Sequence, residues 1–151
     1  MVPYTIAHGV KLSYLIERWG RMIVGGLLVR HGTVLLGKRS PQRTLAPNLW
    51  DVFGGHVEPG ESAEAALVRE LDEELDIQAT HVTLLEVLDD PHPFDGAFSL
   101  FLVETWEGVP HNHCPEEHTE IRWFSLAELE QIPLAHPAYA TICRRMLAVS
   151  S

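Results

Sequence analysis

The sequence predicts a single α/β domain, a sandwich in which helices cover a mixed central sheet. Two observations lead to this fold class. Short β-rich segments alternate with amphipathic helical segments, and no linker, repeat or low-complexity tract divides the 151 residues. Apolar residues make up 46% of the chain and charged residues 21%, so a domain of this length can bury a core without disulfide or metal staples.

The domain is expected to begin with a β-hairpin. Residues 22–30 and 33–38 are rich in aliphatic and β-branched side chains, and His31-Gly32 between them suits a two-residue turn. Residues 40–47 contain two prolines and are expected to form a loop.

A short strand and a long helix follow. Residues 49–53 favour an aromatic strand, which we expect Gly54-Gly55 to end. Residues 62–75 contain no glycine or proline, and Ser62 can cap the first turn of a helix there. Leucines recur on one face of this helix, at Leu67, Leu71 and Leu75.

The second half of the chain continues the alternation. Strands are expected at residues 80–88, 97–104 and 120–124. Ser125 and Glu128 have the spacing of a capping box for a short helix, and a last helix is expected over residues 138–148.

The charge balance argues against two classes of partner. The chain has 11 Lys and Arg against 21 Asp and Glu, a net charge of −10 with histidine neutral. A chain this acidic is not expected to bind nucleic acid or an anionic membrane through a broad basic face. Only two cysteines are present, and the N-terminus has no signal-peptide pattern, so we expect a reduced, cytoplasmic setting.

Residues 1–21 are expected to be an N-terminal extension of a domain that spans residues 22–151. The extension carries several apolar side chains, which we expect to pack on the domain or on a partner subunit. The sequence therefore leaves open whether the protein forms a homodimer.

Acidic residues concentrate on the predicted helix. Glu70, Glu73 and Glu74 fall at i, i+3 and i+4, so their carboxylates share one face. One interpretation is that this face is solvated and that its carboxylates repel one another only mildly. The other is a set of ligands for a divalent cation such as Mg²⁺, which prefers carboxylate oxygens.

A longer pattern favours the second interpretation. Gly55 is followed after five residues by Glu61 and, after seven more, by Arg69-Glu70-Leu71-Asp72-Glu73-Glu74-Leu75-Asp76-Ile77. This pattern closely resembles the signature of the Nudix hydrolases, and eight of its nine specified positions match. The exception is Asp76, which stands where the family has glycine, at a position past the helix that requires a left-handed backbone. Aspartate tolerates that conformation better than most residues.

The resemblance implies a Nudix-type α/β/α sandwich and a set of site residues. It implies that Mg²⁺, or Mn²⁺, is held by Glu70, Glu73, Glu74 and the carbonyl group of Gly55. It also implies that Arg69 pairs with Glu61 and holds the preceding loop against the helix, although an ordinary surface ion pair is an equal alternative.

Further residues are candidates by the same resemblance. Glu117, in the loop before a late strand, would be the catalytic base or a further metal ligand, with Glu116 as the runner-up, and Glu73 is the alternative base. Lys38 and Arg39, at the end of the second strand, would contact substrate phosphates.

The function implied is Mg²⁺-dependent hydrolysis of a nucleoside diphosphate linked to a variable group, with a nucleoside triphosphate as the leading substrate. ADP-ribose or a dinucleoside polyphosphate is the alternative substrate. A Nudix-fold protein that binds nucleotides without turnover is the alternative of another class.

One histidine-rich segment has a different interpretation. His111-Asn112-His113-Cys114, with His118 nearby, superficially resembles a site for a soft metal. No second pair of ligands follows at zinc-finger spacing, and prolines flank the segment. We therefore interpret it as a solvated loop.

Overall fold

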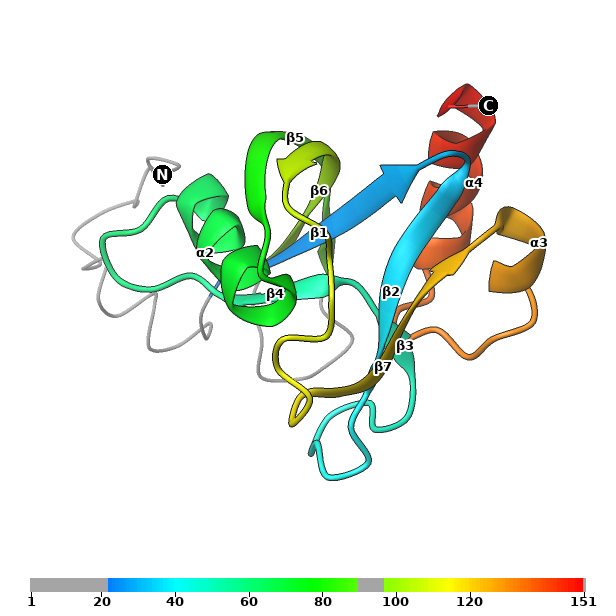
Figure 1. Ribbon diagram of the computed structural model, residues 1–151, viewed down its shortest axis with the longest axis horizontal. Coiled ribbons are helices and arrows are strands. Elements are labelled where there is room, and N and C mark those ends of the chain that lie inside the picture. The colour runs from blue at the N-terminus through cyan, green and yellow to red at the C-terminus, as the bar shows by residue number, and fades with distance from the viewer. Residues whose placement is uncertain (1–21, 90–96, 151) are drawn as a thin grey trace, which may run out of the picture.

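A computed structural model of the protein describes residues 22–89 and 97–150 (Figure 1). The predicted extension at residues 1–21 lies outside the described residues. In the described part, the strands form one seven-stranded sheet. Its order is β3 (Trp50–Asp51), β2 (Thr33–Arg39), β1 (Ile23–Arg30), β6 (Ala97–Glu107) and β5 (Gln78–Asp89). In addition, β4 (Phe53–His56) pairs with β1, and β7 (His118–Phe124) pairs with β2. None of the helices in this part is long and apolar enough to span a membrane.

The first strand is the centre of the sheet. β1 (Ile23–Arg30) and β2 (Thr33–Arg39) form the predicted antiparallel hairpin, and β1 also pairs in parallel with β6 (Ala97–Glu107). β6 in turn pairs antiparallel with β5 (Gln78–Asp89), which makes the sheet mixed, as predicted. β7 (His118–Phe124) pairs antiparallel with β2.

The strand prediction around the double glycine was wrong. β3 (Trp50–Asp51) is followed by β4 (Phe53–His56), which runs through Gly54 and Gly55 and pairs antiparallel with the N-terminal half of β1. The glycines allow close approach instead of ending the strand. A Cβ atom on Gly54 would collide with the carbonyl oxygen of Val24 on the neighbouring strand.

Helices cover both faces of the sheet. α2 (Ala63–Leu75) lies on one side, and α3 (Leu126–Leu129) and α4 (Tyr139–Ser150) lie on the other (Figure 1). Each side has its own apolar core, because alternate residues of β1 point in opposite directions: Leu28 packs in the core beneath α2 and Leu27 in the core beneath α4. This is the predicted α/β/α sandwich.

The caps of α2 are as the sequence predicted. The Ser62 hydroxyl accepts a hydrogen bond from the Ala65 amide at 3.1 Å. At the other end, Asp76 has the left-handed conformation, with φ 56° and ψ 45°, and its amide donates to the Asp72 carbonyl group. The caps fix both ends of the helix that carries the acidic cluster. The capping box of Ser125 and Glu128 also forms.

Candidate active site

A cavity of about 470 Å³ opens between the N-terminal part of the sheet, α2, and the loops around them. One end is lined by acidic side chains from α2 and from the loop before β7. Two arginines lie on the β2–β3 side. Phe98 of β6 and Tyr139 of α4 also line the cavity, with residues of β1, β4 and the loop before α2.

The three glutamates of α2 do not occupy equivalent positions. Glu70 and Glu74 line the cavity, with side chains 15% and 4% exposed. Glu73 is 57% exposed and is not among the residues lining the cavity; its carboxylate lies 3.5 Å from Nη1 of Arg69. Helical spacing places the three on one face, but β4 and the loop before β7 cover only two of them.

Glu74 is the most strongly perturbed carboxyl group at the site. Burial raises its pKa well above the ordinary value, and the negative charges of Glu117 and Glu70 add to the effect. Its Oε2 atom is buried and has no hydrogen-bond partner within residues 22–89 and 97–150. A buried carboxylate oxygen without a partner is costly to the fold and is suited to a cation or a proton.

The loop before β7 brings a third carboxylate to this point. Ligand atoms of Glu74, Glu117 and His118 all lie within 4.8 Å of one another. The backbone amide of His113 donates to the Glu74 carbonyl group at 3.0 Å, which ties the loop to α2. The sequence predicted Glu117 as a site residue, and the structure places it against Glu74.

His118 is a buried neighbour of the site, and its interpretation as part of a solvated loop was wrong, because it begins β7 and packs under the cavity. Its side chain is 4% exposed and its Nδ1 atom lies 3.9 Å from Oε1 of Glu74. Burial, together with the positive charges of Arg43 and Arg39, lowers the pKa of His118 to about 4. Burial raises the pKa of Glu74 and lowers that of His118, so it disfavours the charged form of both groups and opposes an ion pair between them.

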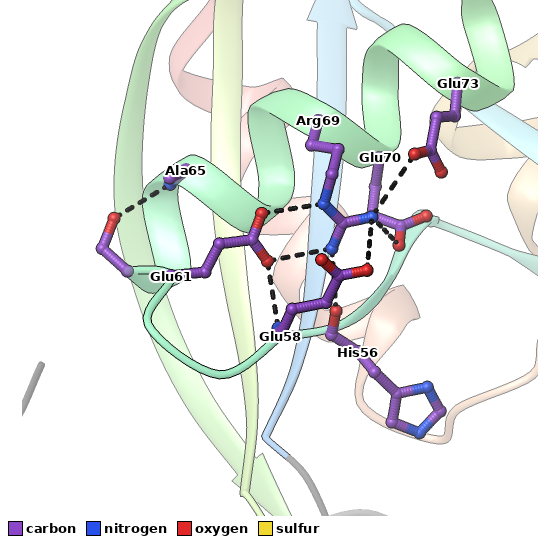
Figure 2. Close-up of polar contacts among 8 residues, drawn as sticks. His56, Glu58, Glu61, Ala65, Arg69, Glu70 and Glu73 are labelled. Atoms are coloured by element: carbon purple, nitrogen blue, oxygen red, sulfur yellow. Dashed lines mark hydrogen bonds and ion pairs between the residues drawn. The ribbon is translucent and has the colours of Figure 1, made fainter.

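The loop before α2 is held by Arg69 (Figure 2). Arg69 donates from Nε and Nη2 to the two carboxylate oxygens of Glu61, at 2.8 and 3.0 Å, and from Nη2 to the His56 carbonyl group at 3.1 Å. Hydrogen bonding to Arg69 lowers the pKa of Glu61 to about 2. The predicted pairing of Arg69 with Glu61 is confirmed.

Arg69 also positions one of the cavity carboxylates. Its Nη1 donates to Oε1 of Glu70 at 2.9 Å, and Figure 2 shows the guanidinium group between Glu61 and Glu70. Burial nevertheless raises the pKa of Glu70, and Arg69 only partly offsets it. Gly55 lies directly beneath this carboxylate: a Cβ atom there would lie 2.6 Å from Oε1 of Glu70. Only glycine leaves room for Glu70 in this place.

The basic side of the cavity comes from the β2–β3 region. Arg39 is 13% exposed and is held by Asp51 at 3.1 Å and by the Leu45 carbonyl group at 2.9 Å. Arg43 lines the same cavity, with Nη1 at 3.9 Å from Oε2 of Glu117. Lys38, which the sequence placed beside Arg39 as a phosphate contact, is not among the lining residues.

Asp51 and Tyr139 form a polar pair that sequence reasoning missed. The Tyr139 hydroxyl donates to Oδ1 of Asp51 at 2.6 Å, across 88 residues of sequence. Both residues line the cavity, next to Phe98. The sequence carried no signal that could have joined them, because they come from β3 and α4.

The donor set fits a divalent cation. The carboxylates of Glu70, Glu74 and Glu117 line one cavity, and the orphaned Oε2 of Glu74 is an unused ligand atom among them. Oxygen ligands of this kind are those that Mg²⁺ and Mn²⁺ prefer. Together with Arg39 and Arg43, the arrangement can hold a polyphosphate and a cation side by side.

Comparison with known proteins agrees with this chemistry. The family model described as NUDIX domain matches residues 20–146. The chain is 35% identical to the CTP pyrophosphohydrolase of Escherichia coli (strain K12) over 84% of its own length and 91% of that protein. It is also 32% identical to the NAD-capped RNA hydrolase NudC of Deinococcus radiodurans, but it spans only 38% of that larger protein.

Solved structures give the same result for the fold. The structure of a MutT NUDIX hydrolase from Burkholderia pseudomallei superimposes with a TM-score of 0.72 and 33% identity, over 85% of this chain and 95% of that one. The solution structure of the E. coli ORF135 protein superimposes with a TM-score of 0.69 and 33% identity, over 87% and 91%.

Proposed function

The chain belongs to the Nudix family and is a Nudix pyrophosphohydrolase, and on that premise we propose that it hydrolyses a nucleoside triphosphate to the monophosphate and pyrophosphate with Mg²⁺ as cofactor. The observation that carries this proposal is a single cavity that combines a buried, partnerless carboxylate oxygen at Glu74 with Arg39 and Arg43. Such a cavity can bind a cation and a polyphosphate together.

In this proposal, Glu70 and Glu74 would hold Mg²⁺, joined by the Gly55 carbonyl group and by Glu73 after rotation of its exposed side chain. When bound, Mg²⁺ neutralises phosphate charge and lowers the pKa of a coordinated water. Arg69 acts as a positioning residue, because it fixes Glu70 over Gly55 while its other edge anchors Glu61.

The remaining roles follow from position. Glu117, whose Oε2 lies 3.9 Å from Nη1 of Arg43 and whose carboxylate lies against Glu74, would take the proton of the attacking water, with Glu73 as the alternative base. Arg39 and Arg43 would bind the phosphates, and the pre-positioning of Arg39 by Asp51 reduces the entropy lost on binding. Tyr139 and Phe98 would face the nucleoside.

A nucleoside triphosphate is favoured by the similarity to a CTP pyrophosphohydrolase, which extends over 91% of that protein. The similarity to the NAD-capped RNA hydrolase covers only 38% of that larger protein, so most of it has no counterpart in this alignment.

The test is product analysis over a substrate panel. The purified chain is incubated with nucleoside triphosphates, ADP-ribose and diadenosine polyphosphates, each with Mg²⁺ and with EDTA, and products are resolved by ion-exchange chromatography. We expect Mg²⁺-dependent release of pyrophosphate and a monophosphate from at least one triphosphate. The Glu74→Gln variant should abolish it, whereas Asp72→Asn, an exposed carboxylate on the same helix, should not. Preferred turnover of ADP-ribose or of a dinucleoside polyphosphate would refute the triphosphate assignment.

A further inference from the structure

A second cluster of ligand atoms lies on the surface, at the C-terminal end of α2. Asp76, His111 and His113 are all exposed, and one ligand atom from each lies within 4.8 Å of the others. Nε2 of His111 is 3.8 Å from Oδ2 of Asp76. We propose that these three residues form a second metal site, for a borderline cation such as Zn²⁺, which is distinct from the carboxylate site in the cavity.

The tautomers of the two histidines support this assignment. Nδ1 of His113 lies 3.1 Å from the Glu73 carbonyl group, and Nδ1 of His111 lies 3.4 Å from the Val109 carbonyl group. A carbonyl oxygen only accepts, so each ring, when neutral, donates from Nδ1 and keeps its lone pair on Nε2. Metal-binding imidazoles in proteins have this arrangement, in which the other nitrogen is held by a carbonyl or carboxylate oxygen.

The backbone also holds the histidines in place. The amides of His111 and His113 donate to the carbonyl groups of Leu75 and Glu74, at 3.2 and 3.0 Å. The imidazole rings are 5.4 Å apart at a steep angle, so they converge without stacking. Nitrogen and oxygen ligands of zinc lie about 2.0–2.2 Å from the metal, so these exposed side chains would rotate to bring their ligand atoms to that distance.

The electrostatic setting favours a cation here. The last turn of α2 has no basic residue, although the negative end of the helix dipole and the Asp76 carboxylate lie there. Asp76 itself replaces the glycine of the Nudix pattern in a left-handed position, where a side chain carries a conformational cost. A role as a metal ligand would account for the Asp76 carboxylate at this position.

An ion at this site would clamp the loop before β7 to α2. The loop carries Glu117, and the helix carries Glu70 and Glu74, so the clamp would fix the spacing of the cavity carboxylates. This consequence rests on the proposed function, whereas the metal site itself does not.

The experiment is a Zn²⁺ titration of the full chain by calorimetry in saturating Mg²⁺, which occupies the cavity carboxylates. The variants Asp76→Gly, His111→Gln and His113→Gln should each weaken Zn²⁺ binding by at least about tenfold. Asp76→Gly suits the left-handed backbone and should fold. His81→Gln, which removes an exposed histidine on β5, is the control and should bind as the parent does.

Nitrogen NMR of the unmodified chain gives a second measurement that depends on no variant. Zn²⁺ should shift the Nε2 resonances of His111 and His113, whereas Mg²⁺ should not. Parent-like affinity in all three variants, or unmoved Nε2 resonances, would overturn the proposal. Glu74→Gln should retain this Zn²⁺ site, so loss of turnover and loss of the surface site can be told apart.

Discussion

Replacing the buried carboxylate Glu74 with glutamine should stabilise the metal-free protein while it destroys activity. Glutamine has nearly the same shape but no charge. Its amide can donate to Glu117, which lies beside it in the cavity, so the substitution relieves both the desolvation of a charge and its repulsion from Glu117 and Glu70.

The size of the gain follows from the unsatisfied oxygen. Oε2 of Glu74 is buried without a hydrogen-bond partner in the described part of the chain. A buried polar atom left unpaired costs about 1–3 kcal/mol. For a domain of this size that corresponds to a rise in Tm of roughly 3–9 °C.

The stability that Glu74→Gln gains over the parent should increase as pH rises. The pKa of Glu74 is raised in the folded state above its ordinary value of 4.5. At this position the folded protein therefore binds more protons than the unfolded chain, and the contribution of Glu74 to the free energy of unfolding falls as pH rises from 4.5 toward its folded-state pKa. The difference between variant and parent should be small near pH 4 and should grow toward neutral pH.

The assay is urea denaturation of both proteins in EDTA over this pH range, with Asp72→Asn as the exposed control. Added Mg²⁺ should raise the stability of the parent more than that of Glu74→Gln, because the ion binds the folded carboxylate site. A variant less stable than the parent at neutral pH in EDTA, or a difference that does not change with pH, would refute the reasoning.

Three other variants test the site. Glu73→Gln should lower kcat by at least about 10³, because the exposed Glu73 side chain would join the metal. The free energy of unfolding in urea should not change. Parent-like turnover would show that Glu73 is not a site residue. His118→Gln should remove one contribution to the pH dependence of stability. Relative to this variant, the parent loses about 3 kcal/mol as pH falls from 6.5 to about 4, because the folded state resists protonation of His118 and the unfolded chain does not. A parent with no such loss, relative to the variant, would contradict the buried, neutral histidine. Arg43→Ala should raise KM at least about tenfold by removing a charged phosphate contact. Lys38→Ala should leave KM unchanged, because Lys38 is not among the residues that line the cavity. Equal effects of the two substitutions on KM would refute the assignment of Arg43, and not Lys38, as the phosphate contact.

Local signals in the sequence were sufficient to predict the helices and most strands and to identify the family. The leucine repeat, Ser62 and Asp76 predicted the limits of α2 to within one residue, because helix formation and capping depend on neighbours a few positions apart. The spacing from Gly55 to Ile77 predicted the family for the same reason, since all of its parts lie on one loop and one helix. The double glycine was misread, because the close approach of β1 that it permits is invisible along the chain.

Tertiary structure alone decided which side chains meet. Glu70, Glu73 and Glu74 are alike in the sequence, but only the packing of β4 and of the loop before β7 makes Glu74 buried and leaves Glu73 exposed. The pairing of Tyr139 with Asp51 and the approach of His111 to Asp76 likewise join residues far apart in the chain. Periodicity specifies the face of a helix on which a residue lies, but burial and charge depend on what packs against that face.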